Sequence, residues 1–223
     1  MVTRGTFLTV EGGEGVGKSL FTSLLKKLLE DRGIEVLTSH EPGGTPVATA
    51  VREIFLAPPG EDPLEPLTEL YLVSACRAQH VGRIIRPALE RGQWVLCDRY
   101  YDSTRVYQGV IGGLAEESLE PVLSQSVDGV HPDLTLLLDC PADVAQERIG
   151  TRSRQQGVPG TRFDEQDAAW HEKLRTAWNS VALRFPDRIR RVDASRSPEQ
   201  VLQQAAGIIE EKLGVSLGAD KNL

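Results

Sequence analysis

The residues with the clearest chemical meaning form a glycine-rich stretch near the N-terminus. It reads Gly12-Gly13-Glu14-Gly15-Val16-Gly17-Lys18-Ser19 and satisfies every fixed position of the pattern G-x-x-x-x-G-K-[ST]. Its glycines allow a tight loop whose N–H groups point inward at phosphate oxygens, and the helix that begins there adds partial positive charge. We expect Lys18 to reach the β- and γ-phosphates of a nucleotide and Ser19 to supply a hydroxyl to Mg²⁺. The stretch therefore predicts a nucleotide-binding P-loop.

A P-loop leaves open whether the protein is a small-molecule kinase, a GTPase switch or an ATPase motor. The Asn-Lys-x-Asp motif with which GTPases read the base is absent, and a motor usually needs a larger chain. Asp98 ends a short apolar run and offers a partner for Mg²⁺. Arg99 follows at once, and arginine is suited to holding a second phosphate. This pair favours the kinase.

Composition narrows the possible partners. The chain has 223 residues and a formal charge of -7, so no strong basic field attracts nucleic acid or an anionic membrane. It contains three cysteines and no Cys/His cluster with zinc-ligand spacing. We find neither a signal-peptide pattern nor an apolar stretch long enough to span a bilayer. These features predict a cytoplasmic protein that binds neither nucleic acid nor membrane.

Strands and helices are expected to alternate along the chain, as in a parallel sheet with helices on both faces. The hydrophobic patterns predict strands at 6–10, 35–38, 94–97, 134–138 and 189–192, and helices at 18–32, 45–56, 67–91 and 198–213. The fold class is therefore α/β with a five-stranded parallel sheet. We expect one domain over 1–213, with a frayed tail at 214–223.

A segment rich in Gly, Ser, Gln and Pro at 150–160 is predicted to be a loop between helices. Arginines lie within it and on either side: Arg148, Arg152, Arg154 and Arg162. Transfer of a phosphoryl group spreads negative charge over its oxygens, and a closing loop that delivers a cation stabilises that charge. We therefore expect a mobile lid at about 150–164.

Several further motifs resemble one known family, the thymidylate kinases of the bacterial type. They are His40-Glu41-Pro42-Gly43-Gly44-Thr45, Cys97-Asp98-Arg99-Tyr100, Asp102-Ser103-Thr104-Arg105-Val106-Tyr107-Gln108-Gly109, the segment 132–139 and Val192-Asp193-Ala194-Ser195. The resemblance runs from the first strand to the last helix. It implies a P-loop nucleoside monophosphate kinase fold, transfer of the γ-phosphoryl of ATP to dTMP with Mg²⁺, and a homodimer.

The resemblance also implies roles for individual residues. Arg99 and Arg52 hold the acceptor phosphate, Arg77 meets the thymine carbonyl edge, Thr104 and Gln108 complete base recognition, and Tyr107 packs the sugar region. Glu41, Pro42 and Val73 belong to the same acceptor region, at about 41–91. Asp98 and Glu14 assist Mg²⁺, together with Ser19, and Ala194 lies near the adenine.

In this family an arginine that neutralises the transferring phosphoryl group comes either from the P-loop or from the lid. The P-loop here carries Glu14-Gly15, so the resemblance implies that the lid supplies it. Arg154 is the first candidate for this catalytic role and Arg162 the second. Lys18, Arg99 and Asp98 complete the expected catalytic set.

The chain departs from the family pattern at three places. His40 stands where an arginine is usual, which weakens the positive field at the acceptor site. Val73 replaces a phenylalanine that stacks on thymine, so acceptor affinity is expected to be lower. The lid is long and ends Thr161-Arg162-Phe163-Asp164 instead of Asp-Arg-x-Glu. Two alternatives therefore remain: a kinase for another pyrimidine monophosphate such as dUMP, and a catalytically silent nucleotide-binding regulator.

Overall fold

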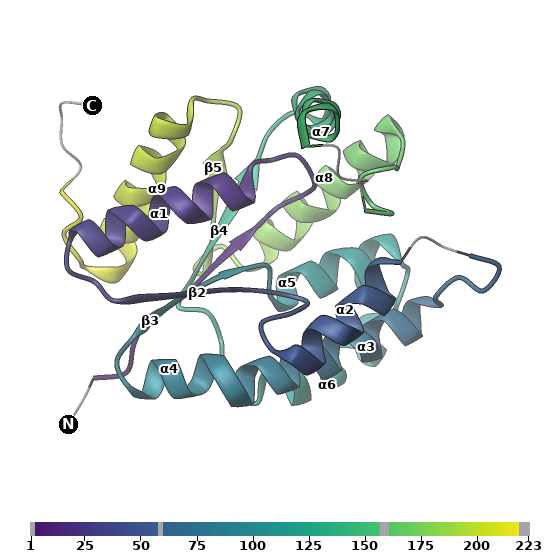
Figure 1. Ribbon diagram of the computed structural model, residues 1–223, viewed down its shortest axis with the longest axis horizontal. Coiled ribbons are helices and arrows are strands. Elements are labelled where there is room, and N and C mark those ends of the chain that lie inside the picture. Colours follow the sequence, from purple (N-terminus) through teal and green to yellow (C-terminus); the bar gives the residue numbers. More distant parts are fainter. Residues whose placement is uncertain (1–2, 58–59, 157–160, 219–223) are drawn as a thin grey trace.

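The computed structural model describes residues 3–57, 60–156 and 161–218. Its centre is a five-stranded sheet with the strand order β2-β3-β1-β4-β5, in which every neighbouring pair is parallel (Figure 1). The strands are β1 (Phe7–Glu11), β2 (Val36–His40), β3 (Trp94–Asp98), β4 (Leu134–Asp139) and β5 (Ile189–Asp193). Parallel strands end at one edge of a sheet, so the residues that follow β1, β2 and β3 converge there. The predicted fold class is confirmed.

The strands are joined by helices, as parallel pairing requires. They are α1 (Lys18–Asp31), α2 (Pro46–Leu56), α3 (Pro66–His80), α4 (Arg86–Glu90), α5 (Tyr101–Thr104), α6 (Glu116–Val127), α7 (Ala142–Gln156), α8 (Ala168–Arg184) and α9 (Pro198–Leu213). Two π-helical segments, η1 (Val81–Ile85) and η2 (Arg105–Ile111), continue α3 and α5. None of the helices in the described ranges has the length and apolar character needed to cross a membrane.

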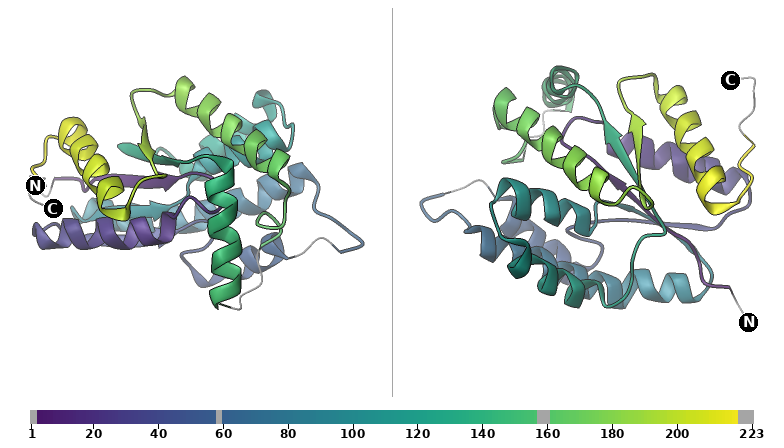
Figure 2. Two further views of the ribbon diagram at one scale, coloured as in Figure 1. Left: turned by 90° about the horizontal axis from the view of Figure 1, so that it is seen from above. Right: turned by 180° about the vertical axis from the view of Figure 1, so that it is seen from behind.

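Side chains that alternate along each strand enter different cores. On β1, Leu8 and Val10 join the core beneath α1 and α9, whereas Phe7 packs with α3, α4 and α6 on the opposite face. Figures 1 and 2 show α1 beside α9 on one side of the sheet and α4 with α6 on the other. A third core lies between η2 and α8, against Leu137 and Ile189.

Two expectations about the chain's irregular parts were wrong. The predicted loop at 150–160 is helical as far as Gln156, where α7 ends, and residues 157–160 lie outside the described ranges. The predicted tail does not fray at 214–218. Leu217 is fully buried in the core of α1 and α9, and its N–H donates to Glu210. Residues 219–223 lie outside the description. Val215 packs against the same core, so burial of apolar side chains orders this short segment.

A buried carboxyl joins the end of β1 to the start of α5. Glu11 Oε1 accepts hydrogen bonds from the backbone N–H groups of Tyr100 and Ser103, at 2.8 and 3.3 Å. Its Oε2 lies 2.7 Å from the Ser103 hydroxyl. Burial, with a smaller contribution from the nearby Asp102, raises the pKa of Glu11 to about 8. This carboxyl therefore links the strand that carries the P-loop to the helix that follows Asp98-Arg99.

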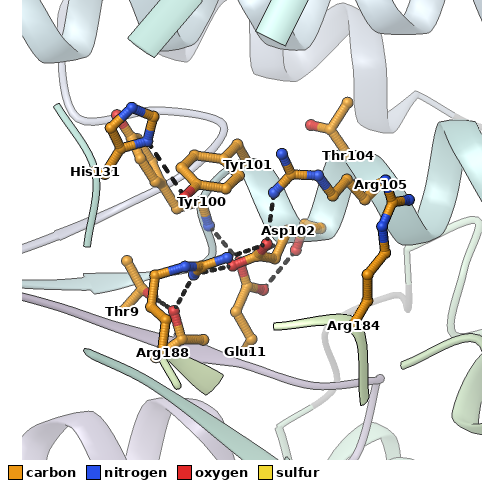
Figure 3. Close-up of polar contacts among 12 residues, drawn as sticks. Thr9, Glu11, Tyr100, Tyr101, Asp102, Thr104, Arg105, His131, Arg184 and Arg188 are labelled. Carbon is orange, nitrogen blue, oxygen red and sulfur yellow. Dashed lines mark hydrogen bonds and ion pairs between the residues drawn. The ribbon is translucent and has the colours of Figure 1, made fainter. Parts of the chain in front are cut away.

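Asp102 anchors the same helix from the other side (Figure 3). Both of its oxygens accept from Arg188, at 2.6 and 2.9 Å, and Oδ1 also accepts from Arg105 at 3.0 Å. Arg188 additionally donates to the Thr135 hydroxyl on β4, which is 2.7 Å from that of Thr9 on β1. A fully buried carboxylate needs such compensation. The network fixes α5 against two neighbouring strands.

We predict that Glu11→Gln changes how stability depends on pH. The pKa of Glu11 in the folded state is raised from 4.5 to about 8. The stabilising contribution of the protonated carboxyl is therefore fully present below pH 4.5 and is lost as the pH rises toward 8. Glutamine stays neutral and can keep these contacts.

Urea unfolding of both proteins between pH 5 and 8 measures this effect. The free energy of unfolding of Glu11→Gln should improve relative to the unmutated protein as pH rises, by up to about 1.4 kcal/mol per pH unit. A difference between the two proteins that stays constant over this range would show that Glu11 is ionised throughout.

Candidate functional site

One cavity of about 770 Å³ lies at the carboxyl edge of the sheet, where ligands bind in open α/β folds. It contains residues from the P-loop, β2, α2, α3, β3, α5, η2, α7 and the segment 161–164. The structure brings most of the predicted site residues together in its wall: Glu14, Gly15, Gly17, Lys18, Ser19, Glu41, Pro42, Arg52, Val73, Arg77, Asp98, Arg99, Thr104, Tyr107 and Gln108.

The P-loop has the backbone geometry that only glycine allows. Gly12 and Gly15 have φ values of 138° and 74°, and a Cβ atom would lie 2.5 Å from the Leu138 carbonyl oxygen and 2.2 Å from that of Ala145, respectively. Gly12, Gly13 and Val16 belong to the loop but do not line the cavity. Val16 is instead buried in the core.

Lys18 is folded back onto its own loop. Its Nζ donates to the carbonyl oxygens of Gly12 and Gly13, at 3.1 and 2.7 Å. Burial, with a smaller contribution from the charge of Arg99, lowers the pKa of Lys18 to about 8. A bound anion would stabilise the charged form of this buried ammonium group, so the site is electrostatically suited to the phosphates of a nucleotide.

Glu14 connects the P-loop to the acceptor side of the cavity. Its Oε1 accepts from Arg99 Nη2 at 3.0 Å and from the Tyr107 hydroxyl at 2.7 Å. The Arg99 guanidinium also lies over the Tyr107 ring, 5.1 Å from its centre. Glu14 was expected to assist Mg²⁺. Its Oε1 lies in an ion pair that orients Arg99, whereas its buried Oε2 has no hydrogen-bond partner among the described residues.

Two arginines face the cavity from different elements. Arg99 follows β3 in a left-handed conformation, with φ 68°, and Arg52 lies on α2 and donates to the Pro42 carbonyl at 2.8 Å. Burial and the charge of Arg99 both lower the pKa of Arg52. An anion between two such cations relieves their repulsion, and arginine matches the oxygens of a phosphate. The arrangement fits the predicted acceptor phosphate site.

A buried polar chain supports Arg77 on α3. Glu41 accepts from Arg77 Nε at 2.8 Å and lies 3.0 Å from His80 Nδ1, while His80 Nε2 is 2.6 Å from the Ser39 hydroxyl. Arg77 Nη2 donates to the Thr104 hydroxyl at 3.1 Å. Arg77 is 2% exposed, and its Nη1 has no hydrogen-bond partner among the described residues. That orphaned donor at a cavity wall is available for a ligand acceptor.

Gln108 is held by a residue that sequence reasoning missed. Its Nε2 donates to Glu69 Oε2 at 2.8 Å, and Glu69 Oε1 lies 2.6 Å from Arg162 Nη2. The Arg162 guanidinium also lies over the rings of Phe55 and Phe163, at 4.9 and 4.4 Å. The expected catalytic role of Arg162 is therefore not supported, because its charge is already paired at the acceptor end.

The arginines of α7 follow helical geometry. Arg148 and Arg152 are four residues apart, share one face and line the cavity. Arg148 donates to the Ala194 carbonyl at 2.8 Å, and Arg152 donates to Asp164 at 2.7 Å. Arg154 lies on another face, is exposed and donates to Gly150. The helix continues through the segment that we expected to be a loop, so Arg154 does not line the cavity in this structure, and its catalytic role stays a prediction.

Ala194 is buried and does not line the cavity, but its carbonyl binds the cavity residue Arg148. Its expected place near the adenine stays a prediction, because its only link to the cavity in the described structure is this contact with Arg148.

Asp98 and Ser19 offer ligands for Mg²⁺. Asp98 Oδ1 is buried with no hydrogen-bond partner among the described residues, and Ser19 is exposed at the start of α1 in the same cavity. Magnesium in phosphate-transfer sites usually takes one or two protein ligands beside substrate phosphates and water. These residues fit that donor set.

His40 and Val73, which depart from the family pattern, change the charge and the shape of the cavity wall. Burial and Arg52 lower the pKa of His40, so this position adds less positive charge than an arginine would. Val73 is buried in the cavity wall with no aromatic face of its own, but Phe163 lines the same cavity. The Phe163 ring lies 5.1 Å from that of Tyr107 and 6.0 Å from that of Phe55.

Sequence signals for the missed residues were weak. Glu69 lies four residues before Val73 and eight before Arg77, so helical spacing alone could have placed it on their face. Glu11 is an acidic residue at the end of an apolar strand. Nothing local distinguishes Phe55 or Phe163 from core aromatics.

Comparison with known proteins agrees with this geometry. The family described as thymidylate kinase matches residues 10–205. The protein named thymidylate kinase in Chromohalobacter salexigens is 43% identical over 212 residues, which cover 95% of this chain and 98% of that protein. The one in Alcanivorax borkumensis is 42% identical, with 93% and 97% covered. The one in Halalkalibacterium halodurans is 36% identical, with 96% and 100% covered. The match over most of its length and the fold confirm the resemblance: this chain belongs to the thymidylate kinase family.

Proposed function

We propose that the cavity binds ATP at the P-loop end and dTMP at the α3–η2 end. The reaction is that of the family: the γ-phosphoryl of ATP passes to the phosphate of dTMP and gives ADP and dTDP. One observation best supports the placement of dTMP at the α3–η2 end. Arg52 and Arg99 line the same cavity as Arg77, whose Nη1 has no hydrogen-bond partner among the described residues. The first pair suits a phosphate, and the orphaned donor suits a base carbonyl.

At the donor end, backbone N–H groups of the P-loop cradle the phosphates and Lys18 moves from the Gly12 and Gly13 carbonyls to the β- and γ-phosphates. Asp98 and Ser19 hold Mg²⁺, which neutralises charge on the donor phosphates when bound. Both residues line the cavity, which supports this assignment.

At the acceptor end, Arg99 and Arg52 bind the phosphate of dTMP. The ion pair with Glu14 aims Arg99, and Tyr107 packs beneath it. Phosphoryl transfer depends on positioning and charge more than on a strong base. A carboxylate that binds both a P-loop segment and the acceptor arginine therefore helps to align donor and acceptor.

Arg148 and Arg152, rather than Arg154, supply the lid cations. Both side chains line the cavity from α7, and a salt bridge to Asp164 holds Arg152 at the cavity wall. Closure of the segment around 150–164 would bring them to the transferring phosphoryl group and exclude water. The catalytically silent alternative is disfavoured, since the charges that transfer requires converge on the cavity.

We also propose a cytoplasmic location and a homodimer. All three cysteines are free and buried, as in a reducing compartment. Val47 and Ile54, seven residues apart on α2, are each 59% exposed, and Tyr71 on α3 is 56% exposed. The two helices pack together, and large apolar side chains that are exposed on neighbouring helices suit an interface.

Substrate choice tests the proposed function directly. In a coupled ADP-release assay with ATP and Mg²⁺, we expect turnover chiefly with dTMP from a panel that includes dUMP, UMP, CMP, dCMP, AMP and GMP. Lys18→Ala, prepared in parallel, should lose this turnover and so controls for a contaminating kinase. Preferential turnover of another monophosphate would refute the assignment of the acceptor end.

The lid assignment predicts a difference between two nearby arginines. Arg152→Ala should lower kcat by at least about 10²-fold, because a cation at the transferring phosphoryl group contributes roughly 10³–10⁵ in rate. Arg154→Ala removes the same charge from an exposed face and serves as the matched control. Steady-state kinetics that show a larger loss for Arg154→Ala would restore the original candidate.

The proposed dimer predicts that a charge on α2 separates the subunits. Ile54→Glu should shift the mass measured by light scattering from that of a dimer to that of a monomer. Leu183→Glu places the same charge on α8, where the side chain is 82% exposed, and should leave the mass unchanged. An unmutated protein that is monomeric at micromolar concentration would contradict the proposal.

A further inference from the structure

Glu69 is a polar residue of the acceptor region that neither the family pattern used above nor the proposed reaction assigns. It lies on α3 with Val73 and Arg77 at spacings of four and eight residues, so the three side chains share one face of the helix. Its side chain is only 12% exposed, and both carboxylate oxygens are engaged. Oε2 accepts from Gln108 Nε2 at 2.8 Å, and Oε1 pairs with Arg162 at 2.6 Å.

The contact with Glu69 decides which way the Gln108 amide points. A side-chain amide has a donor end and an acceptor end, and a carboxylate ion-paired with an arginine accepts hydrogen bonds. The amide nitrogen must therefore face Glu69. Gln108 is 2% exposed and lines the cavity, and its Oε1 has no hydrogen bond among the described residues. The acceptor end is thus the one left for a ligand.

Arg77 supplies the complementary group on the same wall. Its Nε and Nη2 are bound to Glu41 and Thr104, whereas the buried Nη1 has no partner in the part of the chain that the structure describes. The wall therefore offers one donor, from Arg77, and one acceptor, from Gln108. A thymine or uracil ring presents the matching pair, since O4 accepts and N3–H donates. Cytosine presents the opposite pair, an amino donor and an N3 acceptor.

We propose that Glu69 is a positioning residue that sets the base specificity of the acceptor site by fixing the Gln108 amide, so that the site takes 4-oxopyrimidine nucleotides and rejects 4-aminopyrimidine ones. The inference rests on the proposed placement of dTMP at the α3–η2 end. The ion pair with Arg162, whose guanidinium lies over the rings of Phe55 and Phe163, holds the Glu69 carboxylate in place from the other side. Glu69 itself does not need to touch the base.

The test replaces Glu69 by its neutral isostere and compares two acceptors. In Glu69→Gln the new amide can donate to Gln108, so the Gln108 amide is free to turn and present its nitrogen to the cavity. The ratio of kcat/KM for dTMP to that for dCMP should fall by about tenfold or more, through a higher KM for dTMP. The KM for ATP and the kcat at saturating dTMP should change by less than about threefold, because the transfer site is untouched.

Matched variants separate this role from a structural one. Glu65→Gln removes an exposed carboxylate one turn earlier on the same helix, where no side-chain hydrogen bond caps the helix, and should leave the ratio unchanged. In a Gln108→Ala background, Glu69→Gln should produce no further fall in the ratio, since the effect passes through Gln108. Should Glu69→Gln fail to fold, as judged by thermal unfolding, Glu69→Asp is used instead. It keeps the charge but is too short to reach Gln108, and should lower the ratio.

An unchanged ratio in a folded Glu69→Gln protein overturns the proposal. It is also overturned if the fall persists undiminished in the Gln108→Ala background, which would mean that Glu69 acts through Arg162. Failure of the unmutated protein to use dTMP at all is a different result, because it refutes the proposed function before the role of Glu69 is tested.

Discussion

The structure depends on one buried carboxyl, that of Glu11. It ends the strand that leads into the P-loop, and it binds the two backbone N–H groups that begin the helix after Asp98 and Arg99. The donor and acceptor halves of the cavity are therefore tied together at a point that water does not reach. Phosphoryl transfer gains chiefly from holding two anions in line, so a rigid joint between their binding segments serves the chemistry although it contacts neither substrate.

The ion pair between Glu14 and Arg99 extends this connection into the cavity. Glu14 of the P-loop holds Arg99, and Arg99 lies over Tyr107 of η2. The Asp102 network secures the same helical segment to β4 and β1. Each of these carboxylates would be costly to bury alone, and each is paired with arginine or several donors. The charged groups around the cavity are thus largely compensated. Among the described residues, three charged side chains that line the cavity keep a buried atom without a hydrogen-bond partner: Glu14 Oε2, Arg77 Nη1 and Asp98 Oδ1.

The fold was largely accessible from local patterns. Runs such as 134–138 and 94–97 are short, apolar and bounded by turn residues, and the period of α1 and α9 is helical, so these elements could be assigned nearly to the residue. No bounds were predicted for α5, α6, α7 and α8. The errors came where local composition and tertiary contacts disagree. Gly150 and its polar neighbours favour a loop, yet α7 continues to Gln156. Residues 214–218 look disordered by composition, yet Leu217 reaches the core.

By itself the sequence determined the P-loop, the Asp98-Arg99 pair at the end of β3, and the motifs that place Arg52, Arg77, Thr104 and Gln108 in one cavity, because these depend on residue type and on spacing along the chain. Only the tertiary structure decided what each charge is paired with. It paired Glu14 with Arg99 and Arg162 with Glu69, and it placed Arg148 and Arg152, but not Arg154, in the wall of the cavity. The physical reason is that these ion pairs join residues that are distant along the chain, 12 positions for Arg152 with Asp164 and 85 for Glu14 with Arg99. Their partners therefore follow from the packing of helices against the sheet and leave no local pattern.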